Sequence, residues 1–319
     1  MIGISKLYCG TVEPSDALRY GRLSSSLPSH LLQFSTDKRP VVVWNVTRRC
    51  NLKCVHCYAQ ATKDAEINEL TTQEGKTLID DLAAFGAPVL LFSGGEPLVR
   101  KDLPDLAEYA VQKGMRAVIS TNGTLITPSM ARKLKDIGLS YAGRGSKLIE
   151  EDLSHEASRK VVDLILERTK DLHDRGIPKE VLTVDNHADG PYLYLRLLKE
   201  NPQRAKDVLE LLQMNEGNSS GIGIGCISWD GEVYADQFWR HFSFGNVRQR
   251  PFSEIWTDTS NELMQQLKEK KKHVTGRCAE CQWLDICGGN FRVRAEAVSG
   301  DVWAPDPACY LTDEEIGIG

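Results

Sequence analysis

The chain has 319 residues, a formal net charge of −5, and 41% hydrophobic and 26% charged residues. The length suits one large α/β unit with a smaller appendage, and the hydrophobic share excludes a disordered chain. The acidic balance argues against a general nucleic-acid binder, and no apolar run approaches the ~20 residues that cross a bilayer. The first residues lack a signal-peptide pattern. The nine cysteines therefore predict reduced thiolates that ligate metal in the cytoplasm.

Short apolar runs alternate with amphipathic stretches from about residue 40 onward. Residues 40–46 are β-branched and continuous, which predicts a strand buried on both faces. A helix should follow, with Thr71 or Thr72 as its N-cap and Gly86 at its end. The same alternation predicts a strand followed by a Gly-rich turn over 88–97, strands over 116–123 and 139–143, and helices over 101–114 and 127–138. This βαβα order implies a parallel sheet with function at the carboxyl ends of its strands.

The second half of the chain predicts two long helical stretches, 150–176 and 192–215, around a strand within 179–190. Pro202 should divide the later stretch into two helices. The Gly/Ser/Asn-rich segment 215–225 is the best boundary, and a hairpin with an Asp230-Gly231 turn should follow it. The basic run 268–273 is expected to be a solvated helix end. These features predict an N-terminal extension (1–39), an α/β domain (40–215) and a C-terminal domain (216–319).

Three cysteines, Cys50, Cys54 and Cys57, lie directly after the first predicted strand. Three thiolates within eight residues can bind three corners of a [4Fe-4S] cluster and leave the fourth iron open to a substrate or cofactor. The alternative is a zinc knuckle with His56 or a distant residue as its fourth ligand.

The CxxxCxxC spacing after a first strand resembles the signature of radical S-adenosylmethionine (SAM) enzymes. The segment FSGGEPL (92–98) resembles the second motif of that superfamily, and STNG (120–123) resembles the end of its third strand. The resemblance implies that SAM chelates the open iron and that Gly94, Gly95 and Glu96 hold its methionyl amine. It also makes Asn122 a candidate to bind SAM, although Ser120 or Thr121 could serve only as a helix cap. GGEP alone would fit an ordinary strand-to-helix turn.

Four further cysteines, Cys278, Cys281, Cys287 and Cys309, lie near the end of the chain. By spacing alone they suit a closed [4Fe-4S] cluster or a structural zinc site equally well. The segment CAECQWLDICGGN resembles the SPASM extension of radical SAM enzymes, which implies one auxiliary [4Fe-4S] cluster and two clusters in total. Cys226 is either a remnant of a second auxiliary site or a buried thiol, and the buried thiol is favoured. Cys9 has no assigned role.

Longer stretches resemble the haem-biosynthesis branch of the radical SAM/SPASM family, namely 1–22, 183–190, 236–248 and 291–316. That branch implies an enzyme that removes two acetate side chains from 12,18-didecarboxysirohaem to give Fe-coproporphyrin III through a 5′-deoxyadenosyl radical. The alternative is the related haem d1 reaction on the same iron-tetrapyrrole. An external electron donor of the flavodoxin or ferredoxin type is implied as a partner, whereas nucleic acid and membrane are not. No catalytic residue is assigned beyond the SAM cluster.

The polyanionic substrate that this resemblance implies needs cations, and four arginines are candidates to bind its carboxylates. They are Arg240, Arg248, Arg292 and Arg294, although each is more simply a structural or surface residue. His187 and His241 are possible ligands or acids but are not assigned as catalytic.

The chain is short for this family. Six βα units need ~190 residues, and the pattern yields only four strands by residue 142. The fold expected is therefore a partial (β/α)-barrel of the radical SAM type, shortened by about two βα units near Tyr141–Gly143, with a small SPASM-like domain. A competing hypothesis is an iron–sulfur or tetrapyrrole-binding protein that has lost turnover. A zinc-stabilised interaction module is a third.

Overall fold

The computed structural model describes residues 1–11, 39–54, 57–64, 68–143, 154–177 and 179–318. The chain forms two compact units. We call Ser35–Glu150 with Ser220–Lys268 the sheet unit. The helical unit combines Met1–Phe34, Glu151–Ser219 and Glu269–Gly319. These units interleave along the chain, whereas the predicted domains are sequential, so the predicted domain bounds stay a prediction.

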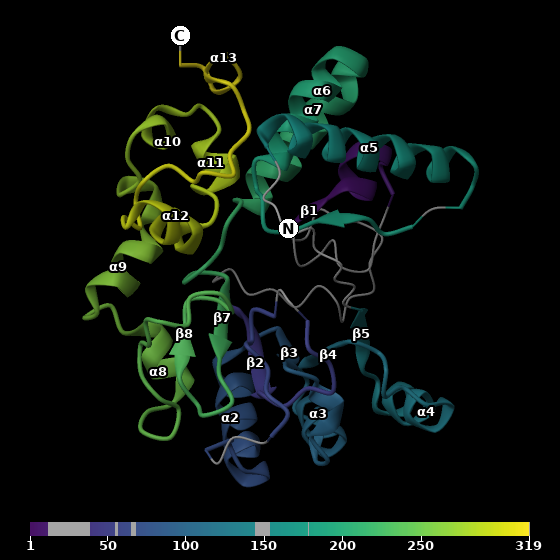
Figure 1. Ribbon diagram of the computed structural model, residues 1–319, viewed down its shortest axis with the longest axis vertical. Helices are drawn as coiled ribbons and strands as arrows, with labels where there is room; N and C mark the ends of the chain where they lie inside the picture. Colours follow the sequence, from purple (N-terminus) through teal and green to yellow (C-terminus); the bar gives the residue numbers. More distant parts are fainter. Residues whose placement is uncertain (12–38, 55–56, 65–67, 144–153, 178, 319) are drawn as a thin grey trace. The chain divides into compact units, whose positions relative to one another are not determined.

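A six-stranded sheet organises the sheet unit, in the order β5-β4-β3-β2-β7-β8 (Figure 1). All neighbours pair in parallel except β7 and β8, which form the expected hairpin. The strands are β2 (Val41–Thr47), β3 (Val89–Gly94), β4 (Arg116–Thr121), β5 (Ser140–Gly143), β7 (Ile224–Ile227) and β8 (Val233–Tyr234). The strands predicted in the first half of the chain are thus confirmed. Because the first five of these strands run in parallel, their carboxyl ends share one edge of the sheet.

Five α-helices accompany the sheet within the described part of this unit. They are α2 (Thr72–Phe85), α3 (Leu103–Gln112), α4 (Pro128–Ile137), α8 (Phe252–Thr257) and α9 (Glu262–Lys268). Helix α2 begins at Thr71, whose hydroxyl accepts from the backbone N–H of Glu74 in a capping box, and it ends at Gly86 in the left-handed region. The expected caps of this helix are confirmed, with Thr71 as the N-cap.

The two faces of the sheet differ in chemistry. Alternate residues such as Trp44 on β2, Phe92 on β3 and Ile119 on β4 belong to one apolar core with side chains of α2 and α3. The intervening positions face the other way and include Asn45 and Ser93, both buried. A period of two along each strand therefore separates a packing face from a face that becomes polar toward the carboxyl ends of the strands.

The sheet is open. Its edge strands are β5 and β8, and they do not pair with each other. The strand expected within 179–190 forms as β6 (Leu182–Thr183), but it pairs antiparallel with β1 (Ile2–Gly3) in the helical unit. The partial barrel expected from the sequence is thus confirmed, and among the described residues no strand extends it beyond β5.

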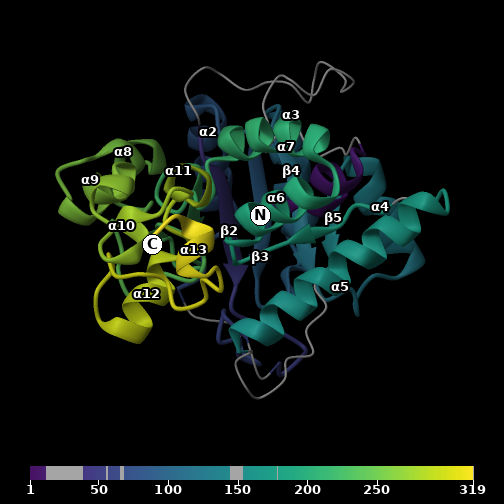
Figure 2. The same cartoon turned by 90° about the horizontal axis from the view of Figure 1, so that it is seen from above.

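The helical unit packs α-helices over that two-stranded sheet. It contains the π-helix η1 (Ser5–Cys9), the helices α5 (His155–Asp174), α6 (Asp189–Glu200), α7 (Pro202–Asn215), α10 (Arg277–Glu280), α11 (Leu284–Cys287), α12 (Arg292–Ser299) and α13 (Asp313–Ile316), and the 3-10 turn η5 (Lys270–Lys272). Pro202 begins α7, as predicted, and Asn201 caps it. Helices α10 to α13 gather near the C-terminus in both views (Figures 1 and 2). None of the described helices is both long and apolar enough to span a bilayer.

Candidate functional site

The loop that carries Cys50, Cys54 and Cys57 leaves the carboxyl end of β2 and is closed at its base by backbone hydrogen bonds. The N–H of Cys50 donates to the carbonyl of Thr62 at 2.9 Å, and the N–H of Thr62 donates to the carbonyl of Arg48 at 2.9 Å. Cys54 is exposed, whereas Cys50 and Cys57 are half-buried. His56, the alternative zinc ligand, lies outside the described residues. The structure therefore presents three thiols on one closed loop at the edge of the sheet.

Backbone N–H groups point at two of these sulfurs. The N–H of Leu52 donates to Cys50 Sγ at 3.4 Å, and that of Ala61 donates to Cys57 Sγ at 3.4 Å. Burial is the main cause that raises the pKa of the Cys50 thiol. Hydrogen bonds of this kind favour the thiolate that a metal requires, and they oppose the effect of burial.

Gly94 and Gly95 lie against the backbone of the cysteine loop. The N–H of Gly95 donates to the carbonyl of Thr47 at 2.9 Å, and a Cβ on Gly95 would sit 2.1 Å from the carbonyl oxygen of Arg49. Gly94 has a φ of +121°, and a Cβ there would lie 2.3 Å from the carbonyl oxygen of Thr47. Both positions therefore require glycine, because the turn after β3 and the cysteine loop touch through their main chains.

Glu96 connects the ends of β3 and β4. Its side chain is 0% exposed. It accepts hydrogen bonds from Thr121 Oγ1 at 2.7 Å, from the N–H of Asn122 at 2.8 Å and from the N–H of Leu98 at 3.0 Å. A carboxylate has about four lone-pair positions, so the three donors among the described residues leave one position.

Asn122 ties β4 to the cysteine loop. Its Nδ2 donates to Asn51 Oδ1 at 3.0 Å and contacts Cys50 Sγ at 3.9 Å, while its Oδ1 accepts from Thr124. Ser120 is buried at the end of the same strand. Asn122 therefore contacts both Cys50 and, through its backbone N–H, Glu96, while Ser120 lies near the end of the strand that precedes it.

Tyr58 joins the cysteine loop to the polar face of the sheet. Its hydroxyl lies 2.8 Å from Ser93 Oγ and 3.3 Å from Asn45 Oδ1. Asn45 Nδ2 in turn donates to Cys226 Sγ on β7 at 3.4 Å. Cys226 is buried with a raised thiol pKa, caused mainly by burial, so the favoured reading of a buried thiol agrees with the structure. Tyr58 is not predicted from the sequence, although its place directly after Cys57 is a signal.

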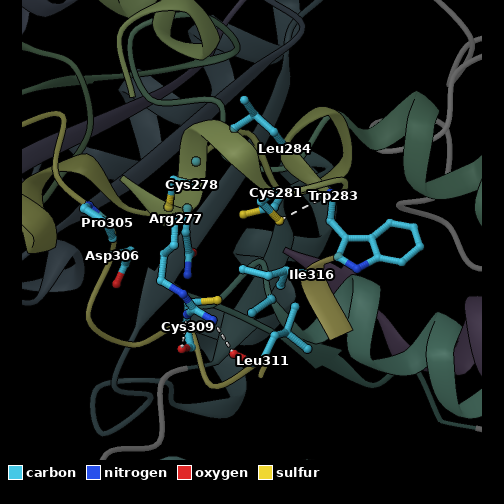
Figure 3. A pocket seen from close by; sticks show the side chains of 14 residues that line it. Arg277, Cys278, Cys281, Trp283, Leu284, Pro305, Asp306, Cys309, Leu311 and Ile316 are labelled. Atoms are coloured by element: carbon cyan, nitrogen blue, oxygen red, sulfur yellow. Dashed lines mark hydrogen bonds between the residues drawn. The ribbon is translucent and has the colours of Figure 1, made fainter. Parts of the chain in front are cut away.

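The four C-terminal cysteines line one pocket of the helical unit (Figure 3). Cys278 lies in α10, Cys281 follows it, Cys287 ends α11, and Cys309 lies in the loop before α13. Apolar side chains such as Trp283, Leu284, Leu311 and Ile316 line the same pocket. The predicted grouping of these four thiols is therefore present.

Burial raises the pKa of three of these thiols. It is the largest cause that raises the pKa of Cys281, Cys287 and Cys309, and for Cys287 the neighbouring cysteines raise it further. The guanidinium of Arg277 lies beside Cys309 and lowers its pKa in part. The N–H of Trp283 donates to Cys281 Sγ at 3.3 Å and acts in the same direction. Arg277 is a residue that the sequence analysis missed, although it directly precedes Cys278.

Asp306, which lines this pocket, and Lys270 are both buried charged side chains. Asp306 is buried and accepts from Arg294 and from the N–H of Phe291 at 2.8 Å. Lys270 is 3% exposed, and its Nζ donates to Asn218 Oδ1 at 3.0 Å. The expectation that the basic run 268–273 is entirely solvated was therefore wrong at Lys270, because a buried backbone loop supplies acceptors for its ammonium.

Three of the four candidate arginines are engaged by the protein itself. Arg292 is fully buried and donates to the carbonyl oxygens of Val302 and Ala304, and Arg294 pairs with Asp306. Arg248 pairs with Glu74 at 2.6 Å. Arg240 has no carboxylate partner among the described residues.

The structure gives a clear environment for only one of the two candidate histidines, His187 and His241. Burial lowers the pKa of His187, whose backbone N–H donates to Asn290 Oδ1 at 2.9 Å. His187 therefore behaves as a satisfied core histidine. For His241 the structure adds no role.

Two family profiles match the chain. The radical SAM superfamily matches residues 44–215, and the SPASM iron–sulfur cluster-binding domain matches residues 224–282. A solved structure described as native anSMEcpe with bound AdoMet has a TM-score of 0.59 at 13% identity, covering 88% of this chain and 96% of that one. This last likeness supports the fold.

Two curated relatives cover most of the chain. "Fe-coproporphyrin III synthase" of Methanosarcina barkeri is 62% identical and covers 99% of each chain. "Pre-heme d1 synthase" of Dinoroseobacter shibae is 32% identical and covers 88% of each. The first alignment spans 396 positions, whereas this chain has 319 residues, so that relative contains several dozen residues that have no counterpart here. This difference agrees with the shortened barrel.

The chain therefore belongs to the radical SAM superfamily, whose enzymes use SAM and a [4Fe-4S] cluster, and it carries a C-terminal SPASM domain of the kind that binds auxiliary iron–sulfur clusters.

Proposed function

We propose that this enzyme removes the two acetate side chains of 12,18-didecarboxysirohaem to give Fe-coproporphyrin III. The observation that carries the proposal is the 62% identity, over 99% of both chains, to a protein named Fe-coproporphyrin III synthase. The related haem d1 reaction is the weaker alternative, since the pre-heme d1 synthase is 32% identical.

In this proposal the loop of Cys50, Cys54 and Cys57 binds the SAM cluster. When bound, that cluster supplies the electron that cleaves SAM into methionine and the 5′-deoxyadenosyl radical that abstracts hydrogen from the substrate. Glu96 receives the methionyl ammonium on its remaining acceptor position, beside the turn of Gly94 and Gly95. Ser120 and Asn122 complete the SAM site at the end of β4.

The four cysteines of the helical unit bind the auxiliary [4Fe-4S] cluster in this proposal. Zinc thiolate sites are tetrahedral with Zn–S distances of about 2.3 Å, so their sulfurs crowd around one point. The iron–sulfur cluster-binding profile matches residues 224–282, which contain Cys278 and Cys281, and this match supports a cluster rather than one zinc ion.

The partners follow from this chemistry. The enzyme receives electrons from an external donor of the flavodoxin or ferredoxin type, and its substrate is an iron-tetrapyrrole. Seven thiols reserved for metal require a reducing compartment, which supports the cytoplasm.

The open sheet favours a second candidate function. Because the described sheet ends at β5 and the relative is several dozen residues longer, an iron–sulfur protein without turnover is the competing proposal. The two differ in one product. The enzyme forms 5′-deoxyadenosine from SAM, whereas the competing protein does not.

The experiment is anaerobic incubation of the reconstituted protein with SAM, reductant and 12,18-didecarboxysirohaem. We expect 5′-deoxyadenosine together with a tetrapyrrole product whose mass reports the loss of two acetate groups. A product mass matching the haem d1 precursor would favour the alternative reaction. Absence of 5′-deoxyadenosine above background would defeat the enzyme proposal for this chain.

The cluster ligands are tested by iron and sulfide counts on serine variants. Cys57→Ser and Cys309→Ser should each lose about half of the iron, about four of about eight atoms if each site holds a cubane. Cys9→Ser is the matched control and should keep all of it. Zinc without sulfide in the native protein would contradict both cluster assignments.

A further inference from the structure

Trp229 lies at the same edge of the sheet as the cysteine loop. Strand β7 pairs in parallel with β2, with Ile227 opposite Trp44, so the turn that follows β7 emerges beside the end of β2. The N–H of Leu70 donates to the carbonyl of Trp229 at 2.7 Å, and the Trp229 side chain is largely buried. A large aromatic ring is therefore fixed next to the residues around the N-terminal cysteines.

Two guanidinium groups lie over this ring. The Cζ of Arg240 is 4.6 Å from the ring centroid of Trp229, and that of Arg48 is 5.4 Å from it. Arg48 also anchors the cysteine loop, since its Nε donates to the carbonyl of Gln60 at 2.8 Å. Cation–π contact orients a guanidinium plane and lets it stay positive where solvent is limited.

Among the described residues, the guanidinium of Arg240 has a hydrogen-bond acceptor on only one side. Its Nη1 donates to the carbonyl oxygen of Tyr58 at 3.2 Å, directly after Cys57. Its Nε is buried and has no acceptor, and no described carboxylate pairs with it. The Nε–Nη2 edge, which is the edge that grips a carboxylate through two parallel hydrogen bonds, therefore has no partner among the described residues.

Such a group is costly unless it serves a ligand. A buried donor without an acceptor destabilises the protein, and more so when it is charged. Arg248 and Arg294 avoid this cost through Glu74 and Asp306. Arg292 also has a buried Nε without a partner, but it is fully buried and both of its Nη atoms donate to backbone carbonyls. Arg240 differs from them because neither its Nε nor its Nη2 has an acceptor among the described residues, and this oriented edge lies beside the cysteine loop.

We infer that the Nε–Nη2 edge of Arg240, oriented by Trp229 and the Tyr58 carbonyl, binds a carboxylate of the iron-tetrapyrrole substrate. This inference rests on the proposed function and adds the residue that recognises the substrate. It places one acidic side chain of the macrocycle against the loop of Cys50, Cys54 and Cys57. Arg240 acts here by binding, with no part in proton or electron transfer.

The test compares Arg240→Met and Arg240→Lys with the control Arg250→Met. Arg250 belongs to the same unit but forms an exposed ion pair with Asp258. Each reconstituted protein is titrated with 12,18-didecarboxysirohaem and with its carboxylate methyl esters, and SAM binding is measured in parallel. A charge-assisted hydrogen bond contributes about 1.5–3 kcal/mol. Arg240→Met should therefore weaken binding of the free acid about 10- to 100-fold, and the control should not.

The ester separates recognition from a merely structural role. For native protein the ester should bind more weakly than the acid, whereas Arg240→Met should bind both alike, because the variant has already lost the contact that the ester removes. Arg240→Lys keeps the positive charge but cannot form two parallel hydrogen bonds. Its affinity for the free acid should therefore lie between those of native protein and Arg240→Met.

Three results would count against the inference in distinguishable ways. If native protein binds no tetrapyrrole, the proposed function itself fails. If native protein binds it and Arg240→Met binds it equally well, Arg240 is not the recognition residue. If Arg240→Met weakens acid and ester by the same factor and also weakens SAM binding, the arginine only braces the cysteine loop.

Discussion

Thr121 donates its hydroxyl hydrogen to the buried carboxylate of Glu96 across 2.7 Å, and this contact joins the ends of two parallel strands. The N–H of Asn122 reaches the other carboxylate oxygen at 2.8 Å. Both side-chain oxygens of Glu96 are thus fixed in direction before any ligand arrives. A site prepared in this way loses little freedom when it binds an ammonium group.

Replacing Glu96 by glutamine should weaken SAM binding without removing the cluster. The amide turns one acceptor oxygen into a donor that faces other donors, which should also lower the free energy of unfolding by about 1–3 kcal/mol. Calorimetric SAM titration and denaturant unfolding measure the two effects. Glu108→Gln, at an exposed position on α3, should change neither. Unchanged SAM affinity in Glu96→Gln would remove this residue from the site.

Gly95→Ala should displace the cysteine loop. The added Cβ would lie 2.1 Å from the carbonyl oxygen of Arg49, and no main chain can tolerate that contact without moving. We expect loss of the iron bound by the N-terminal cysteines, with the auxiliary iron retained, as measured by iron analysis and electron paramagnetic resonance.

The control for Gly95→Ala is Gly114→Ala. Gly114, unlike Gly95, has a positive φ, and nothing lies within 4 Å of its Cβ position. This control should lose about 1 kcal/mol of stability and no iron. Full iron content in Gly95→Ala would show that cluster binding does not need the close approach of Gly95 to the Arg49 carbonyl.

Tyr58→Phe should loosen the cysteine loop, because Tyr58 links this loop to β2 and β3. The hydroxyl contacts Ser93 at 2.8 Å and Asn45 at 3.3 Å, so its loss leaves buried polar groups with fewer partners. We expect a decrease of about 1 kcal/mol in the free energy of unfolding, together with faster removal of iron by a chelator. Tyr109→Phe, which loses an exposed contact with Asp80, should leave chelation rates unchanged. Equal rates in both variants would contradict a supporting role for Tyr58.

The Glu74–Arg248 pair should stabilise the protein in a pH-dependent way. The hydrogen bond from Arg248 is the largest cause that lowers the pKa of Glu74 from 4.5 to about 2. Because the folded pKa lies below the unfolded one, the stabilisation is complete above pH 4.5 and is lost as pH falls toward 2. The difference in unfolding free energy between native protein and Glu74→Gln should therefore shrink between pH 5 and pH 3. A difference that grows with acidity would refute the pairing.

Local patterns predicted the elements of this fold because local chemistry determines them. The Thr71 cap, the break at Pro202 and the Asp230-Gly231 turn depend on residues within a few positions of each other. The cysteine, GGE and STN motifs could be placed at one edge because parallel strands bring their ends together. The pairing of β6 with β1 could not be foreseen, since two residues near the N-terminus carry no periodic signal.

The partners of the four candidate arginines could not be predicted from the sequence. The sequence around the four candidate arginines does not distinguish them. In the structure, however, Arg248 is paired with Glu74 and Arg292 is buried among carbonyl groups. The sequence does not reveal which acceptors surround a guanidinium, because those acceptors come from distant segments. The same reason explains why Lys270, in a basic run, is buried.

Strand β7 belongs to the segment that the iron–sulfur domain profile matches, yet it is hydrogen-bonded along β2, the strand that leads into the SAM cysteines. A chain cut at the boundary between the two profiles would turn β2 into a bare edge with unpaired N–H and C=O groups, a template for aggregation. The two segments that these profiles match therefore cannot be exchanged independently of each other. An exchange of C-terminal segments between relatives that preserves the sheet has to begin after Lys268, and β7 has to be inherited together with β2.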